Sequence, residues 1–81
     1  MKIIVLGPGC PNCRKLEAMC LEVIAELGID AQVEKITNVN HFSDFGVWLT
    51  PAISINGEVR IQGKVPTKAT LMGWIKKEAQ K

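Results

Sequence analysis

The sequence has few aromatic residues and no long hydrophobic run. Tryptophan and phenylalanine occur twice each, tyrosine is absent, and aromatic residues make up 5% of the chain, so its core must be mainly aliphatic. The longest uninterrupted apolar run, Ile3 to Leu6, is far short of the ~18–20 residues that cross a membrane. Because Gly7-Pro8-Gly9 ends this run, it also lacks the length of a signal-peptide core. We therefore expect neither a membrane association nor an export signal.

An excess of charge of one sign is lacking as well. Ten lysines and arginines against eight aspartates and glutamates leave a net charge of +2, with the signs mixed along the chain. Nucleic-acid binding needs clustered positive charge, so no nucleic-acid partner is expected. Apolar residues make up 47% of the 81 residues, which excludes a disordered chain. Residues 1–81 are expected to form one domain and to act as a monomer.

Cysteine is present, but only three times. Without an export signal, we expect a cytoplasmic location, where thiols stay reduced. A close cysteine pair in such a protein is more often catalytic or metal-binding than a structural crosslink.

The first third of the chain predicts a strand, a helix and a second strand. Residues 3–6 are typical of a strand buried on both faces. Residues 11–27 repeat apolar positions every three or four residues, as an amphipathic helix does, with Pro11 in its first turn and Gly28 at its end. Residues 29–36 predict an edge strand. The apolar face of the helix comprises Cys13, Leu16, Cys20, Val23, Ile24 and Leu27.

The rest of the chain predicts a second helix, a hairpin and a third helix. Residues 38–45 form a short helix closed by Gly46, and residues 52–55 and 59–63 form two strands. Asn56-Gly57 between these strands is the strongest short hairpin signal. The short helix presents Val39, Phe42 and Phe45 on one face, and the last helix, capped by Thr67, presents Leu71, Met72, Ile75 and Ala79.

The order β-α-β-α-β-β-α predicts an α/β fold. A parallel βαβ unit followed by an antiparallel hairpin gives a four-stranded mixed sheet with helices on both faces.

The motif that carries chemistry is Cys10-Pro11-Asn12-Cys13, where the first strand leads into the first helix. Residues i and i+3 on a helix have Cβ atoms ~5–6 Å apart, and a disulfide needs ~3.5–4.5 Å, so small adjustments open and close this pair. Cys10 lies at the helix N-terminus, which favours a thiolate, and Gly7 and Gly9 leave that end uncrowded. Cys13 lies on the buried face. We expect Cys10 to attack and Cys13 to resolve the mixed disulfide.

A zinc site and a structural disulfide are the two other uses of such a cysteine pair. A zinc site needs two more ligands, and only Cys20 and His41 are candidates. Cys20 lies seven residues after Cys13, ~10.5 Å along a helix, too far to share an ion whose sulfur ligands lie at ~2.3 Å. A structural disulfide that closes so small a loop constrains the unfolded chain least. We expect Cys20 to be a small buried hydrophobe, His41 a solvated turn residue, and no metal site.

The combined pattern resembles the thioredoxin-like superfamily. The resemblance spans residues 2 to about 77 and is greatest to the small, glutaredoxin-sized redox-active disulfide proteins of prokaryotes. It rests on Cys10-Pro11-Asn12-Cys13, on residues 46–52 around Thr50-Pro51, on Asn56-Gly57, and on Gly63 before the last helix. It implies a redox-active Cys10–Cys13 disulfide with no other cofactor.

The resemblance also implies a substrate-binding surface. Thr50-Pro51 would be cis, lie against Cys10, and pair through its backbone with an extended substrate segment. Gly7, Gly9 and Gly63 would leave room for a polypeptide. Trp48 would lie on the rim rather than in the core, because Phe42, Phe45 and Leu49 already supply the apolar face of the second helix.

The sequence departs from the family pattern at three places. Gly9 stands where thioredoxins usually carry tryptophan, and Ile4 stands where they place a buried carboxylate. Residues 63–67 lack the acidic pair with which glutaredoxins bind glutathione. Water or the substrate would therefore accept the Cys13 proton, and protein disulfides are expected in preference to glutathione.

The leading hypothesis is a thiol–disulfide oxidoreductase that reduces protein disulfides with electrons from a thioredoxin-reductase-like partner. The alternatives are a metal- or metalloid-binding thiol carrier and a redox-silent interaction module. Small copper chaperones carry methionine before the motif, whereas this chain has Gly9-Cys10. The intact Cys10 and Cys13 count against a redox-silent module.

Overall fold

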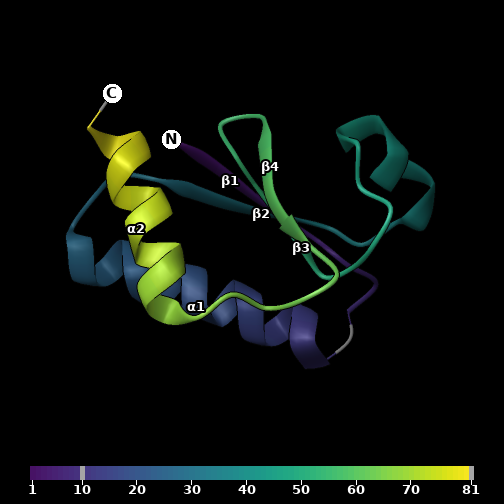
Figure 1. Ribbon diagram of the computed structural model, residues 1–81, viewed down its shortest axis with the longest axis horizontal. Coiled ribbons are helices and arrows are strands. Elements are labelled where there is room, and N and C mark those ends of the chain that lie inside the picture. The colour runs from purple at the N-terminus through teal and green to yellow at the C-terminus, as the bar shows by residue number, and fades with distance from the viewer. Residues whose placement is uncertain (10, 81) are drawn as a thin grey trace.

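The computed structural model describes residues 1–9 and 11–80 (Figure 1). The helices and strands occur in the predicted order. They are β1 (Lys2–Leu6), α1 (Pro11–Leu27), β2 (Gln32–Ile36), the 3-10 helix η1 (Val39–Phe45), β3 (Ala52–Ile55), β4 (Glu58–Gln62) and α2 (Lys68–Ala79).

The four strands form one mixed sheet in the order β2-β1-β3-β4. β1 pairs in parallel with β2, and the other two pairings, β1 with β3 and β3 with β4, are antiparallel. The mixed sheet and the edge position of β2 confirm the sequence predictions. Because β1 and β3 are central, their ends define the two rims of the sheet.

The hairpin between β3 and β4 turns at Asn56 and Gly57, as predicted. Their φ angles are 52° and 86°, and two consecutive positive φ values are what a tight two-residue hairpin turn requires. The Asn56 N–H also donates to the Lys2 carbonyl at 2.8 Å, which ties the turn to the start of β1.

Helices cover both faces of the sheet, as expected. α1 and α2 pack on one face, and η1 packs on the other (Figure 1). The larger buried cluster, on the α1 and α2 side, contains Ile3, Val5, Leu16, Cys20, Val23, Ile53, Ile55, Leu71 and Ile75. The smaller, on the η1 side, contains Ile4, Leu6, Phe42, Val47 and Ala52.

The predicted helix ends are present. Gly28 follows α1 with a φ of 63°, and its N–H donates to the Ile24 carbonyl at 3.0 Å. Thr67 caps α2, because its hydroxyl oxygen accepts a hydrogen bond from the Thr70 N–H at 3.2 Å.

Several predicted burial positions are wrong. The second helix is a 3-10 helix, and Val39 in its first turn is exposed. Leu49 follows the helix in an exposed loop and does not contribute to its apolar face. In α2, Ala79 is exposed and Glu78 is buried. The helical repeat accounts for this, since Leu71, Ile75 and Glu78 follow i, i+4, i+7 spacing along one face.

Candidate functional site

The candidate site begins where β1 ends. Gly7 follows β1, is buried, and donates its N–H to the Ile36 carbonyl at 3.0 Å. A Cβ placed on Gly7 would lie 3.0 Å from the Cys13 Cβ, closer still to the Cys13 Sγ, and 4.0 Å from the Pro51 Cα. The sequence predicts open space for a substrate beside Gly7. That prediction is wrong, because the Cys13 side chain fills the space.

The Gly7 contacts bring together two segments that are far apart in the sequence. Cys13 is in the first turn of α1 and is 5% exposed, as its place on the apolar face predicted. Pro51 is buried directly before β3, and the Thr50–Pro51 peptide bond is cis, the isomer that the resemblance implied. The second cysteine of the motif and the cis-proline therefore meet at one rim of the sheet.

Thr50 presents main-chain groups at this rim. It is half-buried, and neither its N–H nor its C=O forms a hydrogen bond with another described residue. Its neighbour Pro51 is tied to the end of β4, because the Pro51 carbonyl accepts from the Gly63 N–H at 2.9 Å. Thr50 thus keeps a donor and an acceptor available beside a fixed proline.

The segment before Thr50 is exposed and apolar. The side chain of Trp48 is 77% exposed and that of Leu49 is 61% exposed, so Trp48 is not a core residue. The side-chain oxygen of Gln62 accepts hydrogen bonds from the N–H groups of Trp48 at 2.8 Å and Leu49 at 3.1 Å. Sequence reasoning missed Gln62, since no local pattern links it to a loop 13 residues earlier.

Those of the remaining predicted site residues that the structure describes lie near the same rim. Cys10 lies outside the described residues. Gly9, with a φ of 93°, Pro11 and Asn12 are exposed near the start of α1. Gly63 is exposed with a φ of 86°, but a Cβ placed on it would lie 3.2 Å from Leu49 atoms. Gly63 therefore makes room for Leu49 as well as lying beside the site.

Cys20 lies deep in the core, away from this rim. It is a free thiol with no exposed surface. Burial, with a smaller contribution from the Glu17 carboxylate, raises the pKa of Cys20 to about 12. A thiol so hard to ionise is a poor nucleophile, in agreement with the predicted structural role.

The other polar candidates do not gather at the rim. His41 is exposed beside Asp44, with 3.4 Å between its Nδ1 and the Asp44 Oδ2. Ile4, at the position where a carboxylate would be expected, is buried in the cluster under η1. Within residues 1–9 and 11–80, no three His, Cys, Asp or Glu side chains are grouped as a metal site would require.

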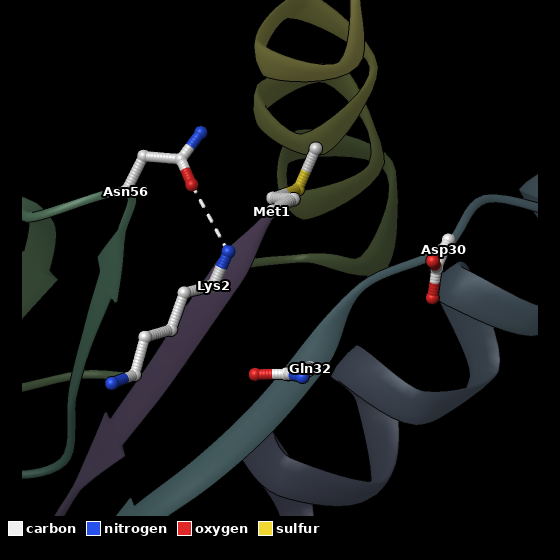
Figure 2. Close-up of a pocket in the computed structure, with 5 residues that line it drawn as sticks. All are labelled: Met1, Lys2, Asp30, Gln32 and Asn56. Atoms are coloured by element: carbon white, nitrogen blue, oxygen red, sulfur yellow. Dashed lines mark hydrogen bonds between the residues drawn. The ribbon is translucent and has the colours of Figure 1, made fainter.

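Two hollows lie at the opposite rim of the sheet. One, of about 410 Å³, is lined by Met1, Lys2, Asp30, Gln32 and Asn56 (Figure 2). The other, of about 450 Å³, shares Met1, Asp30 and Asn56 with it and also reaches Glu78. In Figure 2 the Lys2 N–H points at the Asn56 side-chain oxygen, 3.0 Å away. This rim lies at the start of β1, whereas Gly7 follows its end.

A β-α-β-η-β-β-α chain with a buried cysteine in the first turn of α1 and a cis-proline before β3 has the architecture of a thioredoxin-fold protein. Residues 1–76 match a thioredoxin domain family, and the chain belongs to that family.

Curated relatives from two organisms agree with this assignment. A thioredoxin of Methanothermobacter thermautotrophicus is 41% identical over 68 residues, which cover 84% of this chain and 88% of the relative. Two thioredoxins of Methanocaldococcus jannaschii are 34% identical over 65 residues and 36% identical over 74 residues. These matches cover 80% and 88% of this chain and 74% and 86% of the respective relatives.

The protein is therefore a redox protein of the thioredoxin family. Thioredoxins act through a dithiol of their own and need no separate cofactor. No helix in the described part of the chain is long and apolar enough to span a membrane.

Proposed function

We propose that this protein is a thiol–disulfide oxidoreductase in which Cys10 and Cys13 alternate between a dithiol and a disulfide. The observation that carries the proposal is the meeting of Cys13, Gly7 and the cis Thr50–Pro51 bond at one rim of the sheet. Membership of the thioredoxin family supports the same chemistry. The 81 residues act as one domain.

The reaction is two successive exchanges. The Cys10 thiolate attacks one sulfur of a substrate disulfide, and the substrate S–S bond breaks as the Cys10–substrate bond forms. The first substrate sulfur leaves as a thiolate and takes up a proton. The Cys13 thiolate then attacks the Cys10 sulfur, which releases the second substrate thiol and leaves a Cys10–Cys13 disulfide. Two electrons and two protons pass to the substrate.

The proton of Cys13 needs an acceptor during the second exchange. Ile4 stands where many thioredoxins carry a buried carboxylate, and it packs among apolar side chains under η1. We assign the acceptor role to water or to the departing substrate thiolate, which becomes basic as its disulfide breaks.

Protein disulfides are the proposed substrates. Thr50 has a main-chain donor and acceptor available for an extended segment, as in strand addition. The exposed Trp48 adds apolar contact area. We place Gly9, Pro51 and Gly63 at the border of the same proposed surface. A thioredoxin-reductase-like protein returns electrons to the Cys10–Cys13 disulfide, and the protein works in the cytoplasm as a monomer.

Trapping of mixed disulfides tests this proposal. A Cys13→Ser variant should accumulate a mixed disulfide with insulin through Cys10, because the resolving thiol is missing. A Cys10→Ser variant should trap none, and Cys20→Ser serves as the matched control that should turn over like the wild type. Equal trapping by the Cys10 and Cys13 variants would contradict the assigned roles. Failure of the wild type to reduce insulin would contradict the proposed activity.

A further inference from the structure

The loop that carries Trp48 and Leu49 is hydrogen-bonded to the side chain of Gln62, at the end of β4. We propose that Gln62 is a positioning residue that fixes this loop for the docking of protein disulfides and takes no part in the exchange itself. This inference rests on the proposed function, because it assigns the docking surface that the function requires.

The hydrogen bonds define what Gln62 does. Its side-chain oxygen accepts from the Trp48 N–H at 2.8 Å and from the Leu49 N–H at 3.1 Å. Both partners are donors, so the amide oxygen of Gln62, and not its NH₂ group, must face the loop. One acceptor thus orients two consecutive peptide groups directly before Thr50.

The neighbouring amides have other partners. The Gly46 N–H donates to the Ser43 carbonyl and the Val47 N–H to the Phe42 carbonyl, both at 3.0 Å. These bonds belong to the end of η1 and would survive the loss of Gln62. The Trp48 and Leu49 amides have no second acceptor among the described residues, so their orientation depends on Gln62.

Gln62 also lies next to the main-chain contacts that fix Pro51. It is the last residue of β4 and pairs with Ala52, the first residue of β3. The next residue, Gly63, donates to the Pro51 carbonyl. The main chain after β4 therefore anchors Pro51 while the Gln62 side chain anchors Trp48 and Leu49. Together they fix both sides of Thr50.

Comparing a protein disulfide with a small disulfide distinguishes an effect on substrate docking from an effect on the exchange reaction. An insulin disulfide sits in a polypeptide that can pair with Thr50 and contact Trp48. Bis(2-hydroxyethyl) disulfide has no polypeptide to dock and meets only the attacking sulfur. Loss of Gln62 should slow reduction of insulin and leave reduction of the small disulfide unchanged.

The test compares second-order rate constants of the pre-reduced protein with both disulfides in a set of variants. Gln62→Met keeps the side-chain length and removes the acceptor, and Gln62→Glu restores acceptor oxygens. Gln32→Met is the matched control, because Gln32 is exposed on β2 at the opposite rim. Hydrogen exchange of the Trp48 and Leu49 amides measures directly, in each variant, whether these N–H groups remain protected by hydrogen bonds.

We expect Gln62→Met to lower the rate with insulin about three- to tenfold, as the loss of one or two ordinary hydrogen bonds would. Its rate with the small disulfide should stay within about twofold of the wild type, and the two amides should exchange faster. Gln62→Glu should recover the insulin rate, and Gln32→Met should match the wild type.

Three results would overturn the inference. They are equal loss with both disulfides, unchanged exchange at Trp48 and Leu49 in Gln62→Met, and an insulin rate that stays at the wild-type value in that variant. A wild-type protein that reduces neither disulfide would instead overturn the proposed function. The amide-exchange result would still show whether Gln62 holds the loop.

Discussion

The two rims of the central sheet are built in opposite ways. At the rim after β1, Gly7, Cys13 and Pro51 lie together, the Thr50 N–H and C=O form no hydrogen bond with another described residue, and Trp48 is exposed. At the rim before β1, polar side chains pair with one another. There Glu78 accepts from Arg60 at 2.6 Å and from Asn56 at 3.2 Å, and its side chain is only 6% exposed.

The two hollows described above do not lie at the rim that holds Cys13. Both described hollows lie at the rim with the paired polar groups, where the Asn56 backbone and side chain also bond to Lys2. The proposed exchange with disulfides in polypeptides needs an accessible sulfur and a surface for an extended chain, and the Thr50 main chain and the exposed Trp48 supply such a surface at the rim after β1.

The largest loss of disulfide-reducing activity should come from a methyl group added at the rim after β1. Gly7→Ala places a Cβ against the Cys13 Sγ, so the cysteine or the backbone must move. Displacement of a reacting group by about 1 Å can cost ~100-fold in rate, and overpacking costs about 1–3 kcal/mol of stability. Disulfide-reduction kinetics and urea unfolding measure the two losses.

A second glycine provides the control for that substitution. Gly73 lies in α2, and a methyl group added there would meet no neighbouring atom within 4 Å, so Gly73→Ala should keep full activity. It should also stabilise the helix by about 0.5–1 kcal/mol. Equal activity of the Gly7 and Gly73 variants would show that the contact with Cys13 does not constrain the site.

At the opposite rim, Glu78→Gln should reduce stability without changing the chemistry. The substitution leaves the Arg60 guanidinium, whose side chain is 18% exposed, without its buried carboxylate. Breaking a buried ion pair by removing one partner costs about 3 kcal/mol, whereas replacing both partners by apolar residues is often close to neutral. Urea unfolding should therefore show a large decrease in the free energy of unfolding for Glu78→Gln and a value close to that of the wild type for Arg60→Met/Glu78→Leu.

The folded fraction of Glu78→Gln should reduce disulfides at the wild-type rate, because Glu78 lies at the other rim from Cys13. Loss of specific activity in folded protein would show that the two rims are coupled.

The same contrast explains what the sequence could predict. Features that depend on residues close together in the sequence were predictable. Examples are the turn at Asn56 and Gly57 and the burial of Cys13 on the apolar face of α1. The burial of Glu78 was not, because a hydrophobic pattern selects Ala79, and the partner that stabilises the carboxylate is Arg60, 18 positions away. Gln62 escaped prediction for the same reason, since its acceptor role exists only once β4 lies beside the loop.

A smaller change in stability is expected at Cys20, which lies in α1 but in the core and not at the rim after β1. Cys20→Ala should keep full activity and lose on the order of 1 kcal/mol of stability at neutral pH. The folded thiol has a pKa of about 12, against an ordinary value of 9.0, so only the unfolded chain ionises it between these values. Ionisation of the thiol therefore leaves the free energy of unfolding unchanged below pH 9. Between pH 9 and about 12 it lowers the free energy of unfolding by about 1.4 kcal/mol per pH unit.

The stability advantage of the wild type over Cys20→Ala should therefore shrink above pH 9 and change sign by about pH 10.5, because a loss of about 1.4 kcal/mol per pH unit soon exceeds an advantage on the order of 1 kcal/mol. Urea unfolding of both proteins at pH 8, 9.5 and 10.5 measures the difference, and shared titrations of other groups cancel in it. Parallel curves across this range would contradict the raised pKa. A lower rate of disulfide reduction in Cys20→Ala would contradict its structural role.

The smallest change in stability is expected at Trp48, and the other tryptophan supplies the comparison. Trp48→Ala removes an exposed side chain, so the free energy of unfolding should change by no more than about 0.5 kcal/mol. Its rate with insulin should fall about threefold, with no change for bis(2-hydroxyethyl) disulfide, because only a polypeptide contacts the indole. Trp74→Ala removes a half-buried ring that packs on the α1 and α2 side of the core, so it should cost about 2 kcal/mol and leave the ratio of the two rates unchanged. If both variants lower the two rates equally, or if only Trp74→Ala changes the ratio, the exposed rim does not select protein disulfides.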